Sequence, residues 1–256
     1  MNLIKILLKN IGLFNFLKNI VSNIKIIFIN VIRKLNSNNQ YCTVDTKRCL
    51  ENKTSVKYQY QLFGEDSPVC CNTHLYEMLR DITRVLASND LVHFINYGTF
   101  LGAVRHKGII PWDTDVDIGI LSKDVKNIET VIIKELGNKY YIVKESDSYL
   151  KVYVSKENNI HIDFDIWIDK ETYLEFHGDI YCGTRTMSKD IFFPLKKYKF
   201  YDLEVYGPNS TEFLNIVYGD DYMTVGYKKW GLKSNKIKIV TDSIPAKIDK
   251  TLLETR

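Results

Sequence analysis

Long uncharged hydrophobic runs are missing from this 256-residue sequence. None reaches the roughly 18 apolar residues that a spanning helix needs, which excludes a multi-span membrane protein. Proline and cysteine are sparse, at five residues each, which excludes collagen-like chains and small disulfide scaffolds. The 45% hydrophobic and 26% charged residues are typical of a globular chain and exclude a wholly disordered one.

Acidic residues are absent from the first 34 positions, which hold six basic residues. The rest of the chain therefore has 29 basic and 31 acidic residues. Because this larger part is not basic, its charge gives no support to a nucleic-acid partner.

The N-terminal segment, residues 1–35, is rich in Ile, Leu, Phe and Val, and its polar positions recur at about helical spacing. This pattern predicts a basic amphipathic helix that associates with a membrane. The alternative is a helix that packs on the protein itself or on another subunit. Residues 36–40 are typical of a linker, so we expect the folded domain to start near Tyr41.

Common catalytic motifs are also missing: we find no Walker-type loop, no Ser-His-Asp pattern and no His-x-x-x-His pair.

A cysteine cluster is present, formed by Cys42, Cys49, Cys70 and Cys71. Four thiolates within thirty residues can bind one zinc ion, but two disulfides are equally compatible with the spacing. Cys182 stands alone and is interpreted as a small buried hydrophobic residue.

The hydrophobic periodicity predicts alternating helices and strands. Helices are expected from Thr73 to Asn89, at 123–136 and at 208–218. A turn of small residues at 98–102 is expected to lead into a short helix that ends around 105–108. Strands are expected at 91–97, 116–121, 140–144, 150–155, 160–168 and 199–206. Mixed elements with hairpins in the second half predict an α/β or α+β sheet domain.

The acidic residues Asp113, Asp115 and Asp117 stand two positions apart, so in a strand all three project to one face. A second strand adds Asp163 and Asp165. Closely spaced carboxylates need a cation, and oxygen ligands on two strands suit magnesium or manganese. A solvated acidic turn is the competing interpretation, mainly for Asp113 and Asp163, one of which would only support the site.

Upstream of these acids, Gly98 and Thr99 lie where a strand turns into a helix, so their backbone amides can bind a phosphate. Three consecutive basic residues, Arg105, His106 and Lys107, could neutralise a diphosphate. The ordinary cationic end of a helix is an equally good interpretation for Lys107 and a weaker one for Arg105.

The run Gly98–Asp117 resembles the characteristic motif of the LicD family within the nucleotidyltransferase fold, as do residues 165–167, 193–195 and 218–223. The spacing of the four cysteines matches the zinc loop of the fukutin-related branch of that family. The resemblance implies a nucleotidyltransferase-like mixed sheet with flanking helices, a catalytic domain at 36–256 and a zinc loop at 41–72. It favours Asp165 over Asp163 as the third metal-binding acid, because Ile and Trp follow it.

The resemblance also implies an enzyme that moves a phospho-alcohol from a CDP-alcohol donor to a sugar hydroxyl of a glycan or glycoprotein and releases CMP. CDP-ribitol is the donor implied for the fukutin-related branch, and CDP-choline for others. The competing hypotheses are a nucleotidyltransferase and a non-catalytic, zinc-stabilised glycan-binding module. Self-association is left open. The N-terminal helix and the resemblance together predict a membrane-associated, type II protein of the Golgi lumen, with the cytoplasmic membrane face as the alternative.

Overall fold

The computed structural model describes residues 42–48, 64, 66–146, 149–178, 185–230 and 233–253. The chain divides after Tyr41, and all described residues belong to the unit that follows this boundary. The predicted N-terminal helix and linker, together with Cys49 and Cys182, lie outside the described residues.

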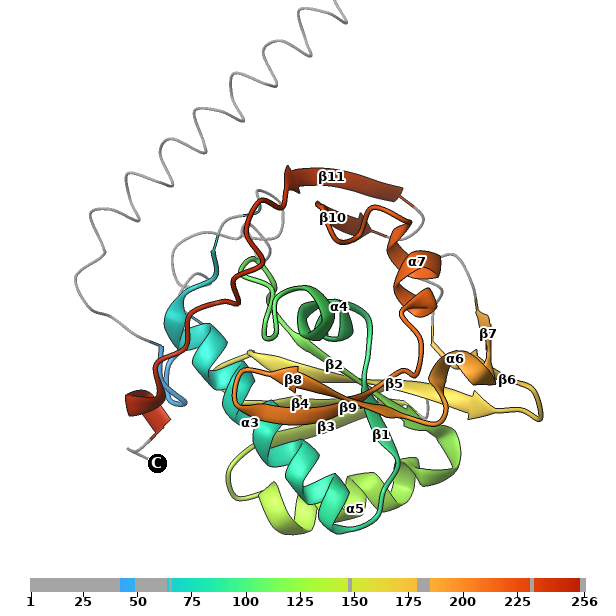
Figure 1. Cartoon of the computed structure of the whole chain (residues 1–256). Coiled ribbons are helices and arrows are strands. Elements are labelled where there is room, and N and C mark those ends of the chain that lie inside the picture. The colour runs from blue at the N-terminus through green and yellow to red at the C-terminus, as the bar shows by residue number, and fades with distance from the viewer. Residues whose placement is uncertain are drawn as a thin grey trace, which may run out of the picture. The chain divides into compact units, whose positions relative to one another are not determined.

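Seven of the described strands form one mixed sheet (Figure 1). Its main path is β1 (His93–Ile95), β2 (Val116–Leu121), β5 (His161–Asp169), β4 (Tyr149–Tyr153) and β3 (Tyr141–Ser146). β6 (Tyr173–Phe176) pairs with the end of β5, and β7 (Thr186–Ser188) pairs with β6. β2 and β5 run parallel, whereas the other neighbouring strands of this sheet run antiparallel.

Helices cover both sides of this sheet. α3 (Val69–Ser88) and α5 (Val125–Leu136) pack together on one side, and α4 (Tyr97–Arg105) lies on the opposite side from α5 (Figure 1). The remaining elements are η1 (Ser122–Asp124), α6 (Lys189–Phe192), the hairpin β8 (Lys196–Phe200)–β9 (Leu203–Gly207), α7 (Glu212–Tyr218), the hairpin β10 (Val225–Trp230)–β11 (Lys233–Ile239) and η2 (Lys250–Leu253).

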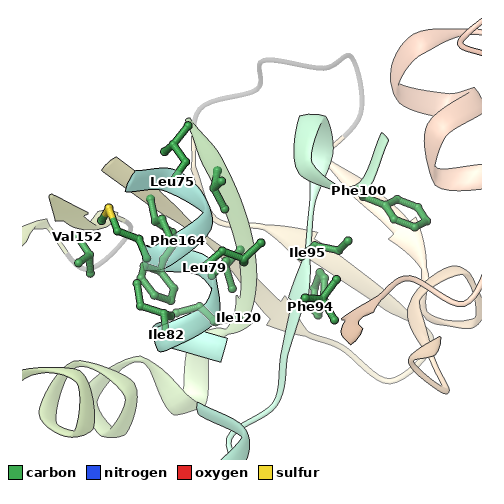
Figure 2. Close-up of a cluster of buried hydrophobic side chains, with 14 of the residues drawn as sticks. Leu75, Leu79, Ile82, Phe94, Ile95, Phe100, Ile120, Val152 and Phe164 are labelled. Carbon is green, nitrogen blue, oxygen red and sulfur yellow. The ribbon is translucent and has the colours of Figure 1, made fainter. Parts of the chain in front are cut away.

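The alternation of side chains in β2 and β5 separates an apolar face from an acidic one. Ile120 of β2 and Phe164 of β5 point toward Leu75, Leu79 and Ile82 of α3 (Figure 2). These five side chains are buried, with at most 3% of their surface exposed. Because successive residues of a strand point to opposite faces, the aspartates that alternate with the apolar residues project away from α3.

The predicted fold class is confirmed: the protein has a mixed sheet with flanking helices. Strand β2 has the predicted bounds. α4 ends at Arg105 as predicted, but it already begins at Tyr97, so residues 98–102 are helical where a turn was predicted. The single strand predicted at 199–206 is wrong, because the chain reverses at Tyr201 and Asp202 to make the hairpin β8–β9. Tyr201 has φ 56°, a left-handed conformation that the alternating pattern did not reveal.

Other boundaries differ in ways that concern the acidic and cysteine residues. α3 begins at Val69 rather than Thr73, which places Cys70 and Cys71 in its first turn. β2 begins at Val116, so Asp113 and Asp115 precede the strand instead of lying in it. The prediction that a single strand carries all three aspartates therefore holds for Asp117 alone.

The predicted localisation requires a correction. Within the described part of the chain, no helix combines the length and the apolar character needed to cross a membrane. The segment on which the prediction depended lies outside that part. Membrane association through an N-terminal helix, and with it the Golgi placement, therefore has no support in the structure.

Gly119 of β2 lies two positions after Asp117, on the same face of the sheet, and Phe94 packs closely against it. A Cβ atom at this position would lie 2.2 Å from Cε2 of Phe94, which faces Gly119 across the β1–β2 pair. We expect Gly119→Ala to cost about 1–3 kcal/mol through overpacking. At about 2–4 °C for each kcal/mol, thermal unfolding should show a clear decrease in Tm.

The matched control is Phe94→Leu, alone and combined with Gly119→Ala. Removing part of the ring relieves the clash, so the loss in the double variant should be smaller than the sum of the single losses. Strict additivity of the Tm changes would contradict this account.

Candidate active site

Three aspartates lie together on the face of the sheet that is turned away from α3. In the parallel pairing, Asp117 of β2 is the register partner of Asp163 of β5, and Asp165 is the partner of Gly119. Register partners in a parallel pair project to the same face, so Asp117, Asp163 and Asp165 share it. All three are half-buried. The sequence therefore predicted correctly that the two strands present their acids together.

Asp115 joins this group from the segment before β2. One ligand atom each of Asp115, His161 and Asp163 lies within 4.8 Å of the others, a spacing at which they could hold a metal ion. The acids thus form two neighbouring sets, with Asp115 close to His161 and Asp163, and Asp117 electrostatically coupled most strongly to Asp165.

Charge repulsion in the group is visible at Asp117 and Asp165. Burial raises the pKa of Asp117 well above its ordinary value, and the carboxylates of Asp165, Asp115, Asp163 and Asp113 raise it further. Burial also raises the pKa of Asp165, and Asp163 adds to the effect. Nδ2 of Asn96 donates a hydrogen bond of 3.0 Å to Oδ2 of Asp165, which opposes the increase in part.

Asp163 differs from its neighbour because the side chains of Lys151 and His161 lie against its carboxylate. Its Oδ1 lies 2.8 Å from Nζ of Lys151, and its Oδ2 lies 3.5 Å from Nε2 of His161. Burial raises the pKa of Asp163, but His161 and Lys151 more than offset this, so the pKa falls below its ordinary value. The two acids of β5 are therefore unequal: Asp163 is ion-paired, and Asp165 is held by a neutral amide.

The start of α4 lies against the same acids. A Cβ atom at Gly98 would come 2.8 Å from Oδ2 of Asp113 and 3.7 Å from Oδ2 of Asp117. Oγ1 of Thr99 accepts a hydrogen bond of 2.8 Å from the backbone N–H of Asp117. Gly98, Thr99 and the aspartates thus lie together, and the absence of a side chain at Gly98 leaves room beside Asp113.

The three consecutive basic residues, 105–107, differ from one another in burial and in their hydrogen-bond partners. Arg105 is 3% exposed, and its guanidinium donates to the carbonyl oxygens of Tyr222 and Val225. His106 is buried and packs edge-on against Trp112. Lys107 is exposed and donates to the carbonyl oxygen of Val104 at 2.9 Å.

Burial lowers the pKa of Arg105 to about 10, which still leaves it charged at neutral pH. Arg105 also contacts the side chains of His106 and Trp112. Its predicted contact with phosphate stays a prediction.

A second candidate metal centre is formed by three of the four predicted cysteines. Sγ atoms of Cys42, Cys70 and Cys71 lie within 4.8 Å of one another, with 3.4 Å between those of Cys42 and Cys70. All three side chains are buried. Zinc–sulfur bonds of about 2.3 Å in a tetrahedron separate the sulfurs by about 3.8 Å, so the cluster fits such an ion. Cys49 lies outside the described residues.

Three residues of the site were missed in the sequence. His161 stands two positions before Asp163, so the alternation that predicted the acidic face also places it there. Lys151 of β4 is the antiparallel partner of Asp163, which becomes recognisable only once the strand order is known. Asn96 gave no signal, because a lone asparagine before a helix is usually an N-cap.

The region that forms this acidic site is similar to known proteins. Residues 90–210 match the family described as LicD/FKTN/FKRP, nucleotidyltransferase domain. An uncharacterized protein of Rickettsia typhi is 36% identical over 136 residues, which cover 52% of this chain and 41% of that protein. The mouse ribitol 5-phosphate transferase FKRP is 28% identical over 194 residues, which cover 70% of this chain and 38% of that protein.

The lipopolysaccharide cholinephosphotransferase LicD of Haemophilus influenzae is 32% identical over 59 residues, which cover 23% of this chain and 22% of that protein. The chain spans half or less of the length of each of these relatives. The matched residues 90–210 include Asn96, the start of α4 and all the aspartates of the site. Residues 90–210 of this chain are thus similar to the LicD/FKTN/FKRP nucleotidyltransferase domain, and this region carries the acidic site.

Proposed function

We propose that this protein is a metal-dependent glycan phosphotransferase that moves a phospho-alcohol from a CDP-alcohol donor to a sugar hydroxyl and releases CMP. The observation that carries the proposal is the convergence of Asp117, Asp163 and Asp165 from β2 and β5 with Asp115 from the segment before β2, and the raised pKa of Asp117 and Asp165. Such repulsion destabilises a protein unless a cation relieves it, and the similarity to the LicD family supplies the reaction class.

Asp115, Asp117 and Asp165 are the proposed ligands of magnesium or manganese, because their oxygens suit hard cations and Asp163 is already ion-paired. When bound, such an ion neutralises the charge of a diphosphate. Asp113 supports the site: its backbone and carboxylate shape the segment that carries Asp115.

The donor diphosphate would approach the start of α4, where the backbone amides near Gly98 and Thr99 face an anion. The acceptor hydroxyl attacks the phosphorus that bears the alcohol, and the bond from that phosphorus to the bridging oxygen breaks, so that CMP leaves. Asp165 takes the hydroxyl proton, since its carboxylate is oriented by the neutral amide of Asn96. Arg105, His106 and Lys107 are the proposed basic residues of the donor site. Arg105 contributes by positioning residues 222–225, since it donates hydrogen bonds to the carbonyl oxygens of Tyr222 and Val225.

Cys42, Cys49, Cys70 and Cys71 are the proposed ligands of a structural zinc ion, within a loop at 41–72 of a catalytic domain at 36–256. The spacing of the three described sulfurs supports this assignment. The acceptor is proposed to be a glycan or glycoprotein, without a nucleic-acid partner, and self-association is compatible with the proposal.

Ribitol 5-phosphate is the favoured group, because the match to FKRP covers 70% of the chain and the match to the cholinephosphotransferase LicD only 23%. Phosphocholine transfer is the second candidate. Turnover of CDP-choline but not of CDP-ribitol would decide for it. Released pyrophosphate would indicate nucleotidyl transfer, and glycan binding without any dependence on magnesium would indicate a binding module.

The first prediction concerns the proposed metal ligands. Asp115→Asn and Asp117→Asn should each lower CMP release from CDP-ribitol by at least about 100-fold, because each removes an anionic ligand while keeping the shape of the side chain. Circular dichroism should stay unchanged. Asp90→Asn is the matched control, since Asp90 is exposed at the end of α3 and its φ of 54° suits asparagine equally. Normal turnover in Asp115→Asn or Asp117→Asn would refute the site.

The second prediction separates the two acids of β5. Asp165→Asn should reduce kcat far more than Asp163→Asn, because Asp163 is ion-paired with Lys151 and Asp165 is the proposed base and ligand. Steady-state kinetics with saturating magnesium measures the difference. A larger loss in Asp163→Asn would instead assign the third acidic position to Asp163, beside Asp115 and His161.

The third prediction uses stability. A carboxyl group whose pKa is raised by folding binds protons more tightly in the folded state. Its ionisation therefore lowers stability as the pH rises above about 4, the ordinary value. Without divalent ions at pH 8, Asp117→Asn should raise the Tm by a few degrees, at about 2–4 °C for each kcal/mol.

This gain in stability should shrink as the pH is lowered toward 4. Magnesium should stabilise the wild-type protein more than Asp117→Asn, because the variant has lost a ligand. Equal stabilisation of both proteins by magnesium would show that Asp117 does not bind it.

A further inference from the structure

The segment 111–115, which carries Asp113 and Asp115, has no helical or strand hydrogen bonding of its own. Three of its backbone carbonyls are bound by residues far away in the sequence. Ser67 donates through its backbone N–H to Pro111 and through Oγ to Asp113, both at 2.6 Å. Nη2 of Arg48 donates to the carbonyl oxygen of Thr114 at 2.8 Å. The position of Asp115 therefore depends on these two residues.

Both donors belong to the segments that carry the cysteines. Ser67 lies three residues before Cys70, and its own carbonyl accepts a hydrogen bond of 3.2 Å from Asn72 in the first turn of α3. Arg48 lies six residues after Cys42. Because Sγ atoms of Cys42 and Cys70 are 3.4 Å apart, the cluster holds the two segments together.

Arg48 connects the cysteines with the acids directly. It is 7% exposed, so its charge needs compensation inside the protein. Burial alone lowers its pKa, but Cys71, and then Asp115 and Cys42, more than offset this, so the pKa lies above its ordinary value. The guanidinium thus lies within the electrostatic reach of both groups while it binds Thr114, the residue between Asp113 and Asp115.

We propose that the cysteine cluster positions the acidic site: Arg48 and Ser67 fix the segment 111–115, so that loss of the metal from the cysteines weakens divalent-cation binding at Asp115 and Asp117. The inference rests on the proposed function in one respect, that Asp115 and Asp117 are metal ligands. Arg48 and Ser67 are positioning residues, since they act through the backbone that carries the acids. Removing groups that orient metal ligands typically weakens metal affinity 10–100-fold.

A purely structural role for the cysteines predicts a different result. Weakened packing would lower the Tm and raise hydrogen exchange throughout the domain. A positioning role confines the change to the amides of residues 112–117 and to cation binding, and leaves the core of α3 and β5 unchanged.

The experiment measures Mn²⁺ affinity by isothermal titration and amide hydrogen exchange by mass spectrometry, in the full chain. Mn²⁺ is a suitable probe because it prefers oxygen ligands over thiolates. The variants are Arg48→Gln and Ser67→Ala. Their matched controls are Arg84→Gln and Ser88→Ala, two exposed residues of α3. A fifth sample is wild-type protein whose cysteine-bound metal has been removed with a chelator.

We expect Arg48→Gln, Ser67→Ala and the chelated protein to bind Mn²⁺ about 10-fold or more weakly, with faster exchange at 112–117 and a normal core. The controls should match the wild type. Ser67→Ala removes one hydroxyl, so it preserves the test if Arg48→Gln does not fold. Unchanged Mn²⁺ affinity in well-folded Ser67→Ala and in the chelated protein would overturn this inference and leave the proposed function intact. Wild-type protein that binds no Mn²⁺ would overturn the proposed function and this inference with it.

Discussion

The parallel pairing of β2 and β5 is the constraint on which the rest of the structure depends. It places Asp117 opposite Asp163 and Asp165 opposite Gly119, so carboxylates of both strands share one half-buried face. Such a face opposes folding, since repulsion and burial both act against the charged forms. The opposite face offsets this cost, because Ile118, Ile120 and Phe164 are almost wholly buried in the apolar core that includes α3, at about 25 cal/mol for each Å² of apolar surface.

The surroundings divide the acids into different chemical roles. The carboxylate of Asp163 is ion-paired with Lys151 and lies against the ring of His161. Asp165 receives the amide of Asn96, which orients the carboxylate without neutralising it. Asp117 is fixed through its backbone, since its N–H donates to Thr99 and its carbonyl accepts from Asn96. A site of fixed geometry and unbalanced negative charge is what a cation-dependent reaction requires.

Features that follow from local periodicity could be predicted from the sequence. The alternation in β2 and β5 gave the acidic face, and the step from strand to helix gave the start of α4. Features that depend on contacts between distant segments could not. Arg105 is an example, because it binds carbonyls of residues more than a hundred positions away. The turn at Tyr201 and Asp202 was missed because both flanking strands continue one alternating pattern.

The segment 107–117 shows why the site is a property of the whole fold. At its start, Lys107 accepts a hydrogen bond from Tyr201, and Ile109 accepts one from Ala246. Its middle is held by Ser67 and Arg48, and its end by Asn96 and Thr99. Several backbone groups of this segment are thus hydrogen-bonded to distant parts of the chain instead of to neighbours in regular structure. The positions of Asp113 and Asp115 are therefore set jointly by the cysteine-bearing segments, the β8–β9 turn and the C-terminal region. We therefore expect a substitution in any of these parts to displace Asp113 and Asp115, although it alters no carboxylate.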